Sequence, residues 1–173
     1  MPNLLTRRLV FGGLTVTAMG LVTPSAQAET RAESVDGILV LKSERKLLLL
    51  RAGSVLESFP IALGACPEGP KRFEGDSRTP EGIYRIAAMN PQSRFHRALH
   101  ISYPNAEDVR RAREAGRSPG GNIAIHGLPN SYGNYDPVAF YKDWTDGCVA
   151  VGNLAIERIW ARVSVGTPVE IRA

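Results

Sequence analysis

The chain has 173 residues, of which 43% are hydrophobic and 22% charged, and its formal net charge is +4. One domain typically takes about 100–200 residues, so the length predicts a single domain with a short extension. The apolar content is too high for a wholly disordered chain, and two cysteines are too few for a disulfide scaffold. With 17 Gly and 12 Pro, the composition favours a turn-rich, mainly β domain.

The N-terminus has the pattern of a cleaved export signal that covers residues 1–28. Arg7 and Arg8 form a positive start, and the apolar run Leu9–Val22 is shorter than the ~20 residues needed to cross a bilayer as a helix. Small residues at positions 26 and 28 then supply a peptidase cleavage pattern. An uncleaved anchor is the alternative, and the pattern leaves the Sec or twin-arginine route open.

Removing this signal leaves a nearly neutral mature chain. The signal carries two bases and no acid, so the formal net charge falls from +4 to +2, and no basic stripe with interleaved aromatic residues follows. We therefore expect no nucleic-acid partner and, after cleavage, no stable membrane anchor. The mature protein begins with a short segment, residues 29–36, and is expected in the periplasm or cell envelope.

The rest of the chain alternates short apolar runs with turns, which predicts strands. Polar or Gly-containing segments such as Ser43-Glu44-Arg45 separate the runs. The expected strands cover Gly37–Lys42, Lys46–Leu50, Val55–Leu63, Ile83–Ala87, Arg97–Tyr103 and Val169–Ile171.

Two short helices interrupt the strands. Asn105 is a suitable N-cap for a helix over Ala106–Ala115, and Gly116 ends it. A second helix is expected from Asn153 or Leu154 to about Arg162, because apolar residues recur there at helical spacing. The pattern as a whole predicts one β-rich domain.

Two segments carry residues that can do chemistry. An apolar strand delivers His126, with Gly127 behind it, and a loop delivers Cys148 just before another apolar run. A thiol attacks a carbonyl carbon as the thiolate, and a neighbouring imidazole is its usual activator. Gly147 lets the backbone approach a substrate, so the amides of Gly147 and Cys148 are candidates for an oxyanion hole. From spacing alone, a buried structural cysteine and a hydrogen-bonded histidine remain the alternative.

Taken together, several segments in order resemble the L,D-transpeptidase catalytic domain, also called the YkuD domain. The family pattern has a His-Gly pair, here His126-Gly127, and then a Ser/Thr-x-Gly-Cys loop, here Thr145–Cys148. A helix follows, here Leu154–Arg162, and then a Gly-Thr-Pro-Val strand, here Gly166–Val169. Upstream of these, Thr79–Tyr84 matches the Thr-Pro-x-Gly-aromatic segment of the family. The resemblance covers residues 37–172. It implies a mainly β fold, a single L,D-transpeptidase-type β-sandwich-like domain with one or two short helices.

The chain departs from the family pattern at two positions. Most members have a second His before the Gly-Cys pair and an Arg or Asn two positions after the Cys, where this chain has Asp146 and Ala150. The segments Asp143–Cys148, Asn90–Phe95 and His100–Pro104 are similar to the YafK branch of the family. Some members of that branch resemble hydrolases that detach proteins from the cell wall.

The resemblance implies a cysteine mechanism without a cofactor. Cys148 is the nucleophile, His126 the general base and acid, and Gly147 a backbone donor of the oxyanion hole. The substrate class is the peptidoglycan stem peptide, attacked at the carbonyl after a diaminopimelate-type residue, and a wall-attached envelope protein is a further candidate partner. The expected roles are in cell-wall biogenesis or degradation and in cell shape.

Five other residues are candidates for the site. Asp146 is expected to orient His126 or to bind a substrate ammonium, with a plain turn residue as the alternative. Gly127, Thr145, His100 and Trp144 are candidate substrate contacts, and for Trp144 packing is the competing interpretation. His96 and His100 are four apart, but in a strand that spacing is about 13 Å, so no metal site is expected.

Three functions stay open. The first is an exported L,D-transpeptidase that works through a Cys148 thioester, for cross-linking or protein attachment. The second is a YafK-like hydrolase of amidase or L,D-endopeptidase type. The third is a non-catalytic wall-binding module in which Cys66 and Cys148 form a disulfide, since an oxidising compartment permits one.

Overall fold

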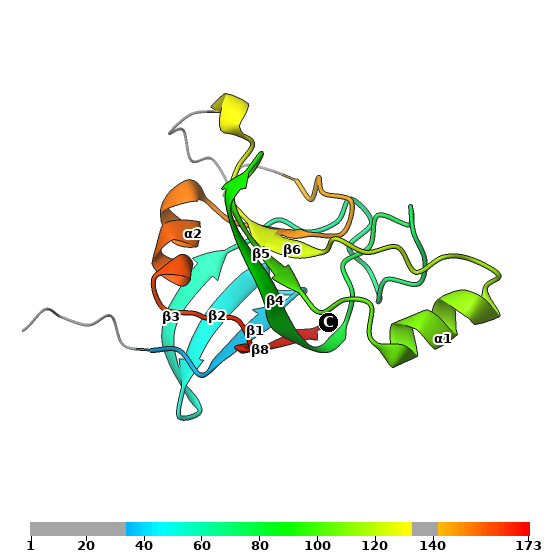
Figure 1. The fold of residues 1–173 in the computed structure, drawn as a ribbon, viewed down its shortest axis with the longest axis horizontal. Coiled ribbons are helices and arrows are strands. Elements are labelled where there is room, and N and C mark those ends of the chain that lie inside the picture. Colours follow the sequence, from blue (N-terminus) through cyan, green and yellow to red (C-terminus); the bar gives the residue numbers. More distant parts are fainter. Residues whose placement is uncertain (1–33, 133–141) are drawn as a thin grey trace, which may run out of the picture. The chain divides into compact units, whose positions relative to one another are not determined.

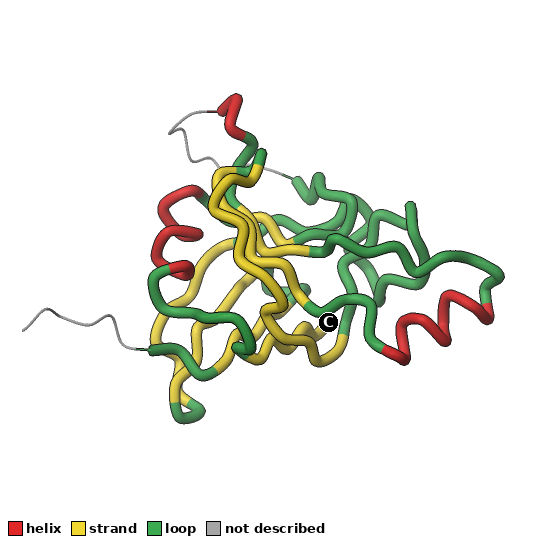
Figure 2. Tube along the Cα trace, in the orientation of Figure 1, coloured by secondary structure: helices red, strands yellow, loops and turns green. Residues whose placement is uncertain are grey.

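The computed structural model describes residues 34–132 and 142–173 (Figure 1). The predicted export signal therefore lies outside the described residues. The elements are β1 (Gly37–Leu41), β2 (Lys46–Arg51), β3 (Ser54–Pro60), β4 (Gly82–Ser93), β5 (His96–Ile101), α1 (Ala106–Glu114), β6 (Ala124–His126), the 3-10 turn Asn130–Tyr132, β7 (Val149–Ala150), α2 (Asn153–Trp160) and β8 (Pro168–Arg172). Figure 2 shows the strands as one connected group, with loops gathered on the side of α1.

The strands form one mixed sheet of eight in the order β3-β2-β1-β8-β4-β5-β6-β7. The N-terminal part of β4 pairs with β8 and its C-terminal part with β5, and register shifts after Ile86 and after Asn90 mark irregularities in that strand. Bulges bend a strand, so β4 turns one half of the sheet towards the other. The chain that leaves edge strand β3 then pairs with β7 at the opposite edge, where Ala62 and Ala150 exchange hydrogen bonds of 2.9 and 2.8 Å.

Alternating strand residues fill the space between the two halves of the sheet. In β1 and β2 every second side chain is buried, as the period of a pleated strand requires. The core is a cluster of aliphatic side chains that includes Ile38, Leu49, Ile125, Val149 and Ile156. The predicted mainly β, sandwich-like fold with two short helices is confirmed.

Both helices lie where the sequence predicts them, α1 behind its cap Asn105 and α2 after β7. The one large difference is β4, which was expected to end at Ala87 and continues to Ser93. The sequence Asn90-Pro91-Gln92-Ser93 looks like a loop, but Pro91 falls within the register shift, where no ladder hydrogen bond is demanded of it. No helix in the described part of the chain is long and apolar enough to cross a membrane.

Candidate active site

The register of the strands brings His126 and Cys148 onto one face of the sheet. β6 and β7 are parallel neighbours in which Ile125 pairs with Val149, and both of these side chains lie in the core. His126 follows Ile125 and Cys148 precedes Val149, so both point to the opposite face. Both side chains line the same cavity.

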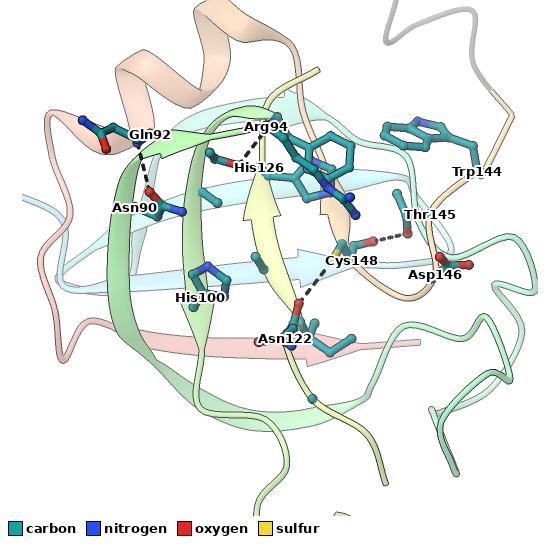
Figure 3. Close-up of a pocket in the computed structure, with 16 residues that line it drawn as sticks. Asn90, Gln92, Arg94, His100, Asn122, His126, Trp144, Thr145, Asp146 and Cys148 are labelled. Atoms are coloured by element: carbon teal, nitrogen blue, oxygen red, sulfur yellow. Dashed lines mark hydrogen bonds between the residues drawn. The ribbon is translucent and has the colours of Figure 1, made fainter. Parts of the chain in front are cut away.

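A cavity of about 590 Å³ opens above that face. Its floor includes Ala98 of β5 and Ala124 of β6, whose methyl groups leave room above the sheet. The cavity is lined by Asn90, Gln92, Ser93, Arg94, Phe95, Ala98, His100, Gly121, Asn122, Ile123, Ala124, His126, Trp144, Thr145, Asp146 and Cys148 (Figure 3).

The His126 ring is buried and its tautomer is set by the backbone. Its Nδ1 lies 2.7 Å from the carbonyl oxygen of Gly127. Since a carbonyl oxygen only accepts, Nδ1 carries the hydrogen and Nε2 is left as a base. Burial lowers the pKa of His126 to about 4, with smaller contributions in the same direction from His100 and Arg94. The imidazole is therefore neutral at pH 7.

Two aromatic rings hold the imidazole in place. The Phe95 ring centroid lies 4.5 Å from that of His126 at an interplanar angle of 31°. The indole of Trp144 meets His126 edge-on at 5.8 Å and Phe95 at 6.0 Å. Such contacts restrict the ring to one orientation. Trp144 therefore packs on the His126 ring, and it also lines the cavity.

The Cys148 thiol is half-buried at the end of the loop that enters β7. Its Sγ donates to the carbonyl oxygen of Asn122 over 3.7 Å. Burial raises the pKa of Cys148 above the ordinary value of a thiol, and the charge of Asp146 adds to that rise. A hydrogen bond with the Ala124 backbone and the charge of Lys71 act against it. The resting thiol is therefore protonated, and its S–H is directed at a backbone carbonyl.

Thr145 shapes the turn that presents the thiol. Its side chain is buried, its Oγ1 accepts from the N–H of Gly147 at 3.1 Å, and it donates to the carbonyl of Cys148 at 2.8 Å. Thr145 also lines the cavity, and its contact with a substrate stays a prediction. An oxyanion would have to compete with this hydroxyl for the Gly147 amide, which leaves the Cys148 amide as the better placed of the two predicted donors.

The segment Arg78–Glu81, remote in sequence, packs against the turn Thr145–Cys148. Gly147 has φ +122°, and a Cβ there would lie 2.5 Å from the carbonyl oxygen of Arg78. The same segment backs Gly64, whose N–H donates to Thr79 Oγ1 at 3.0 Å. The buried ammonium of Lys42 donates to the Thr79 carbonyl at 3.1 Å and pairs with Glu81 at 2.8 Å. The Thr-Pro-x-Gly motif therefore serves to brace the cysteine loop.

Asp146 is exposed at the rim of the cavity. The orienting hydrogen bond of His126 goes to Gly127 and not to Asp146. That predicted role of Asp146 therefore belongs to a backbone carbonyl, and its contact with a substrate ammonium stays a prediction.

Gly127 and the two other histidines take different positions. A Cβ on Gly127 would lie 2.7 Å from Asn153 Oδ1, so this glycine packs against α2 and does not line the cavity. His100 lines the cavity, as a substrate contact would have to. His96 instead bonds Glu157 at 2.7 Å.

Sequence reasoning assigned no role to the turn between β4 and β5. Phe95 and Arg94 lie there, with the guanidinium carbon of Arg94 5.0 Å from the ring centroid of Phe95. The segment Asn90–Phe95 carries a family resemblance but no chemical motif of its own. The available sign of a role for this turn was an aromatic residue, Phe95, beside polar residues at the tip of a hairpin. Its contact with His126 follows only from the fold.

Comparison with known proteins identifies a family. The model of the L,D-transpeptidase catalytic domain, YkuD, matches residues 36–171. "Putative L,D-transpeptidase YafK" of Escherichia coli strain K12 is 32% identical over 133 residues, which cover 73% of this chain and 46% of that protein. The chain thus spans about half the length of the curated relatives it matches.

Solved structures share the fold. The helical cell shape determining protein Pgp2 of Campylobacter jejuni matches with a TM-score of 0.58 and 25% identity, covering 81% of this chain and 48% of Pgp2. Bd1075 of Bdellovibrio bacteriovorus matches with a TM-score of 0.55 and 27% identity, covering 83% of this chain and 50% of that one. With the fold, the paired His and Cys and the family match together, the chain belongs to the L,D-transpeptidase catalytic domain family.

Proposed function

We propose that the protein is an exported cysteine acyltransferase that acts on peptidoglycan stem peptides through a Cys148 thioester. The observation that carries this proposal is the placement of His126 and Cys148 on one face of adjoining strands, at one cavity. The export signal predicted at residues 1–28 and a site of action in the cell envelope belong to the same proposal.

The pKa directions indicate how the reaction starts. With a neutral imidazole and a protonated thiol, the resting pair is uncharged at pH 7. The proton of Cys148 Sγ therefore passes to His126 Nε2 as the sulfur attacks the substrate carbonyl carbon. A small rotation of the thiol away from the Asn122 carbonyl is part of this step, since that carbonyl holds it at rest.

The remaining steps return both groups to their starting state. The tetrahedral oxyanion is stabilised by backbone N–H donors, a contribution worth about 3–4 kcal/mol for one donor in known cases. The C–N bond then breaks, His126 gives its proton to the departing amine, and a thioester remains. An acceptor amine or water attacks the thioester, gives a proton to His126, and the thiolate takes that proton back as it leaves.

The attacking group separates two activities. An amine makes the protein a transpeptidase that forms cross-links or attaches a protein, and water makes it a hydrolase of the stem peptide or of a protein–peptidoglycan bond. The resemblance of the segments Asp143–Cys148, Asn90–Phe95 and His100–Pro104 to the YafK branch keeps hydrolysis as the second candidate. The similarity to Pgp2, whose name refers to cell shape, supports a proposed role in shape.

The decisive experiment is mass spectrometry of muropeptides after incubation of purified protein with sacculi. Cross-links between two diaminopimelate residues, newly attached protein, or a freed protein terminus each identify one outcome. Cys148→Ala and His126→Ala should each abolish turnover, whereas Cys66→Ala should retain it. Full activity of either of the first two variants would overturn the proposal.

The non-catalytic alternative has a separate test. Cys66 and Cys148 are both free thiols in the structure. Thiol titration of the native protein should find two reactive groups; none would support the disulfide-bridged binding module instead. That module would also bind sacculi without changing their muropeptides.

A further inference from the structure

Two side chains of opposite charge lie at the catalytic cavity without a role in the reacting pair. Among the described residues that line it, Arg94 is the one arginine or lysine and Asp146 the one carboxylate. Figure 3 shows Arg94 on the side of His126, and Asp146 on the loop that carries Cys148. The cavity therefore has a positive and a negative group at its rim.

The Arg94 guanidinium is positioned by an aromatic ring. It stacks over the Phe95 ring at 5.0 Å, and Phe95 in turn lies against His126. Stacking uses the flat face of a guanidinium and leaves its N–H fork free at the edge. Among residues 34–132 and 142–173, none of the arginine ion pairs involves Arg94. A guanidinium binds a carboxylate in two-pronged geometry.

Asp146 supplies the opposite charge. Its side chain is exposed, and it sits two residues before Cys148 on the loop that carries the thiol. Asp146, Arg94 and Cys148 line the same cavity of about 590 Å³. A ligand bound in this cavity over Cys148 therefore meets one positive and one negative side chain of its lining.

We propose that Arg94 and Asp146 form a subsite for a free α-amino-acid group, in which Arg94 binds the carboxylate and Asp146 the ammonium. The inference rests on the proposed function. A diaminopimelate-type residue has two amino-acid centres joined by three methylene groups. When the carbonyl of one centre is attacked by Cys148, the other centre remains free and carries one carboxylate and one ammonium.

The subsite would select the acyl donor before any chemistry occurs. A stem peptide with lysine at this position has the ammonium but lacks the carboxylate, and it would leave Arg94 without its ligand. A donor whose free carboxylate is amidated would do the same. With these two charges, the protein would distinguish stem peptides that contain diaminopimelate from stem peptides that contain lysine.

Binding measurements in a Cys148→Ala background test the subsite apart from the reaction. Isothermal titration calorimetry would use three synthetic tetrapeptide stems: one with the free centre intact, one amidated at its carboxylate and one acetylated at its amine. We expect each modification to weaken binding about 10- to 100-fold. Arg94→Gln should then bind the intact and amidated stems equally while still rejecting the acetylated stem. Asp146→Asn should show the reverse.

Arg97→Gln is the matched control. Arg97 stacks on Trp160 at 4.8 Å and pairs with Glu157 at 2.8 Å, away from the cavity, so its loss should leave all three affinities unchanged. Equal binding of the three stems by the parent would overturn the subsite while leaving the proposed function intact. Equal weakening of all three by Arg94→Gln would overturn the carboxylate contact and assign Arg94 to holding Phe95. Binding of none of them would overturn both the subsite and the proposed substrate.

Discussion

The buried imidazole of His126 couples the chemistry of the site to the stability of the fold. Its ring is enclosed by Phe95 and Trp144, and its Nδ1–H is used by a backbone carbonyl. A charge placed there would lose its hydration without gaining an anionic partner among the described residues that contact it. The neutral form that suits a general base is therefore also the form that the fold requires.

This coupling predicts an acid-sensitive stability. The pKa of His126 is about 4 in the folded protein and about 6.5 in the unfolded chain, so between these values the unfolded state binds more protons and stability falls as pH falls. Between pH 7 and pH 5 the loss from this residue should be about 2 kcal/mol. Urea denaturation at both pH values measures it. His126→Gln should remove that loss and His100→Gln should keep it; an unchanged loss in His126→Gln would contradict the assignment.

Cys148 should react slowly with alkylating agents for a catalytic thiol. Because burial and Asp146 raise its pKa, little thiolate is present at pH 7, and the alkylation rate should climb about tenfold per pH unit without a plateau near pH 6. Iodoacetamide labelling of Cys66→Ala across pH 6–9 tests this. Asp146→Asn should speed labelling several-fold, because it removes a negative charge that opposes ionisation. A pH-independent rate below pH 7 would instead indicate a preformed ion pair.

The two residues that we propose to react could be singled out from the sequence, and their surroundings could not. His126 and Cys148 belong to short local motifs, which can be recognised in the sequence alone. The contact of Phe95 with His126 joins residues 31 positions apart, at a hairpin tip that is formed by the part of β4 beyond Ala87, which the sequence did not predict. The hydrogen bond between the His126 ring and the Gly127 carbonyl depends on the local backbone conformation, which the residue types alone do not determine.

At the scale of elements, the turn between Thr145 and Cys148 depends on glycine for two reasons. Gly147 adopts φ +122°, which side chains rarely tolerate, and it has no space for a Cβ. Gly147→Ala should therefore destabilise the protein and reduce turnover, because relief of the 2.5 Å clash with Arg78 moves the residue next to the nucleophile. Denaturant unfolding and the muropeptide assay measure the two effects.

Gly75→Ala is the control for backbone strain alone. Gly75 also has a positive φ, of +83°, but nothing lies within 4 Å of the position that a Cβ would occupy there. This variant should lose on the order of 1 kcal/mol and keep its activity. Equal losses of stability and activity in the two variants would show that the clash at Gly147 is unimportant.

The helix α1 was predictable because its signals are local. Asn105 Oδ1 accepts from the N–H groups of Glu107 and Asp108, and the Asp108 carboxylate accepts from the N–H of Asn105 in return. Asn105→Ala should cost about 1 kcal/mol of unfolding free energy. Arg113→Ala, at an exposed position of the same helix, should change it by less than about 0.5 kcal/mol. Thermal or urea unfolding distinguishes them, and equal effects would show that the cap is dispensable.

At the scale of the whole molecule, the two sheet edges meet beside the site. The pairing of Ala62 with Ala150 joins the chain after β3 to β7, two residues from the nucleophile. Apolar alternation predicted the strands, but strand order and this closure depend on contacts between residues far apart in sequence, which alternation cannot specify. The family resemblance supplied what the pattern alone lacked.

The floor of the cavity has a consequence of its own. Ala98 and Ala124 line the cavity on the same face of the sheet as His126, and an alanine side chain has no reactive group. A larger side chain at either position would reduce the volume of the cavity without moving the Cys148 sulfur or the His126 imidazole. Two related chains that differ only at these positions would catalyse the same reaction with acceptors of different size.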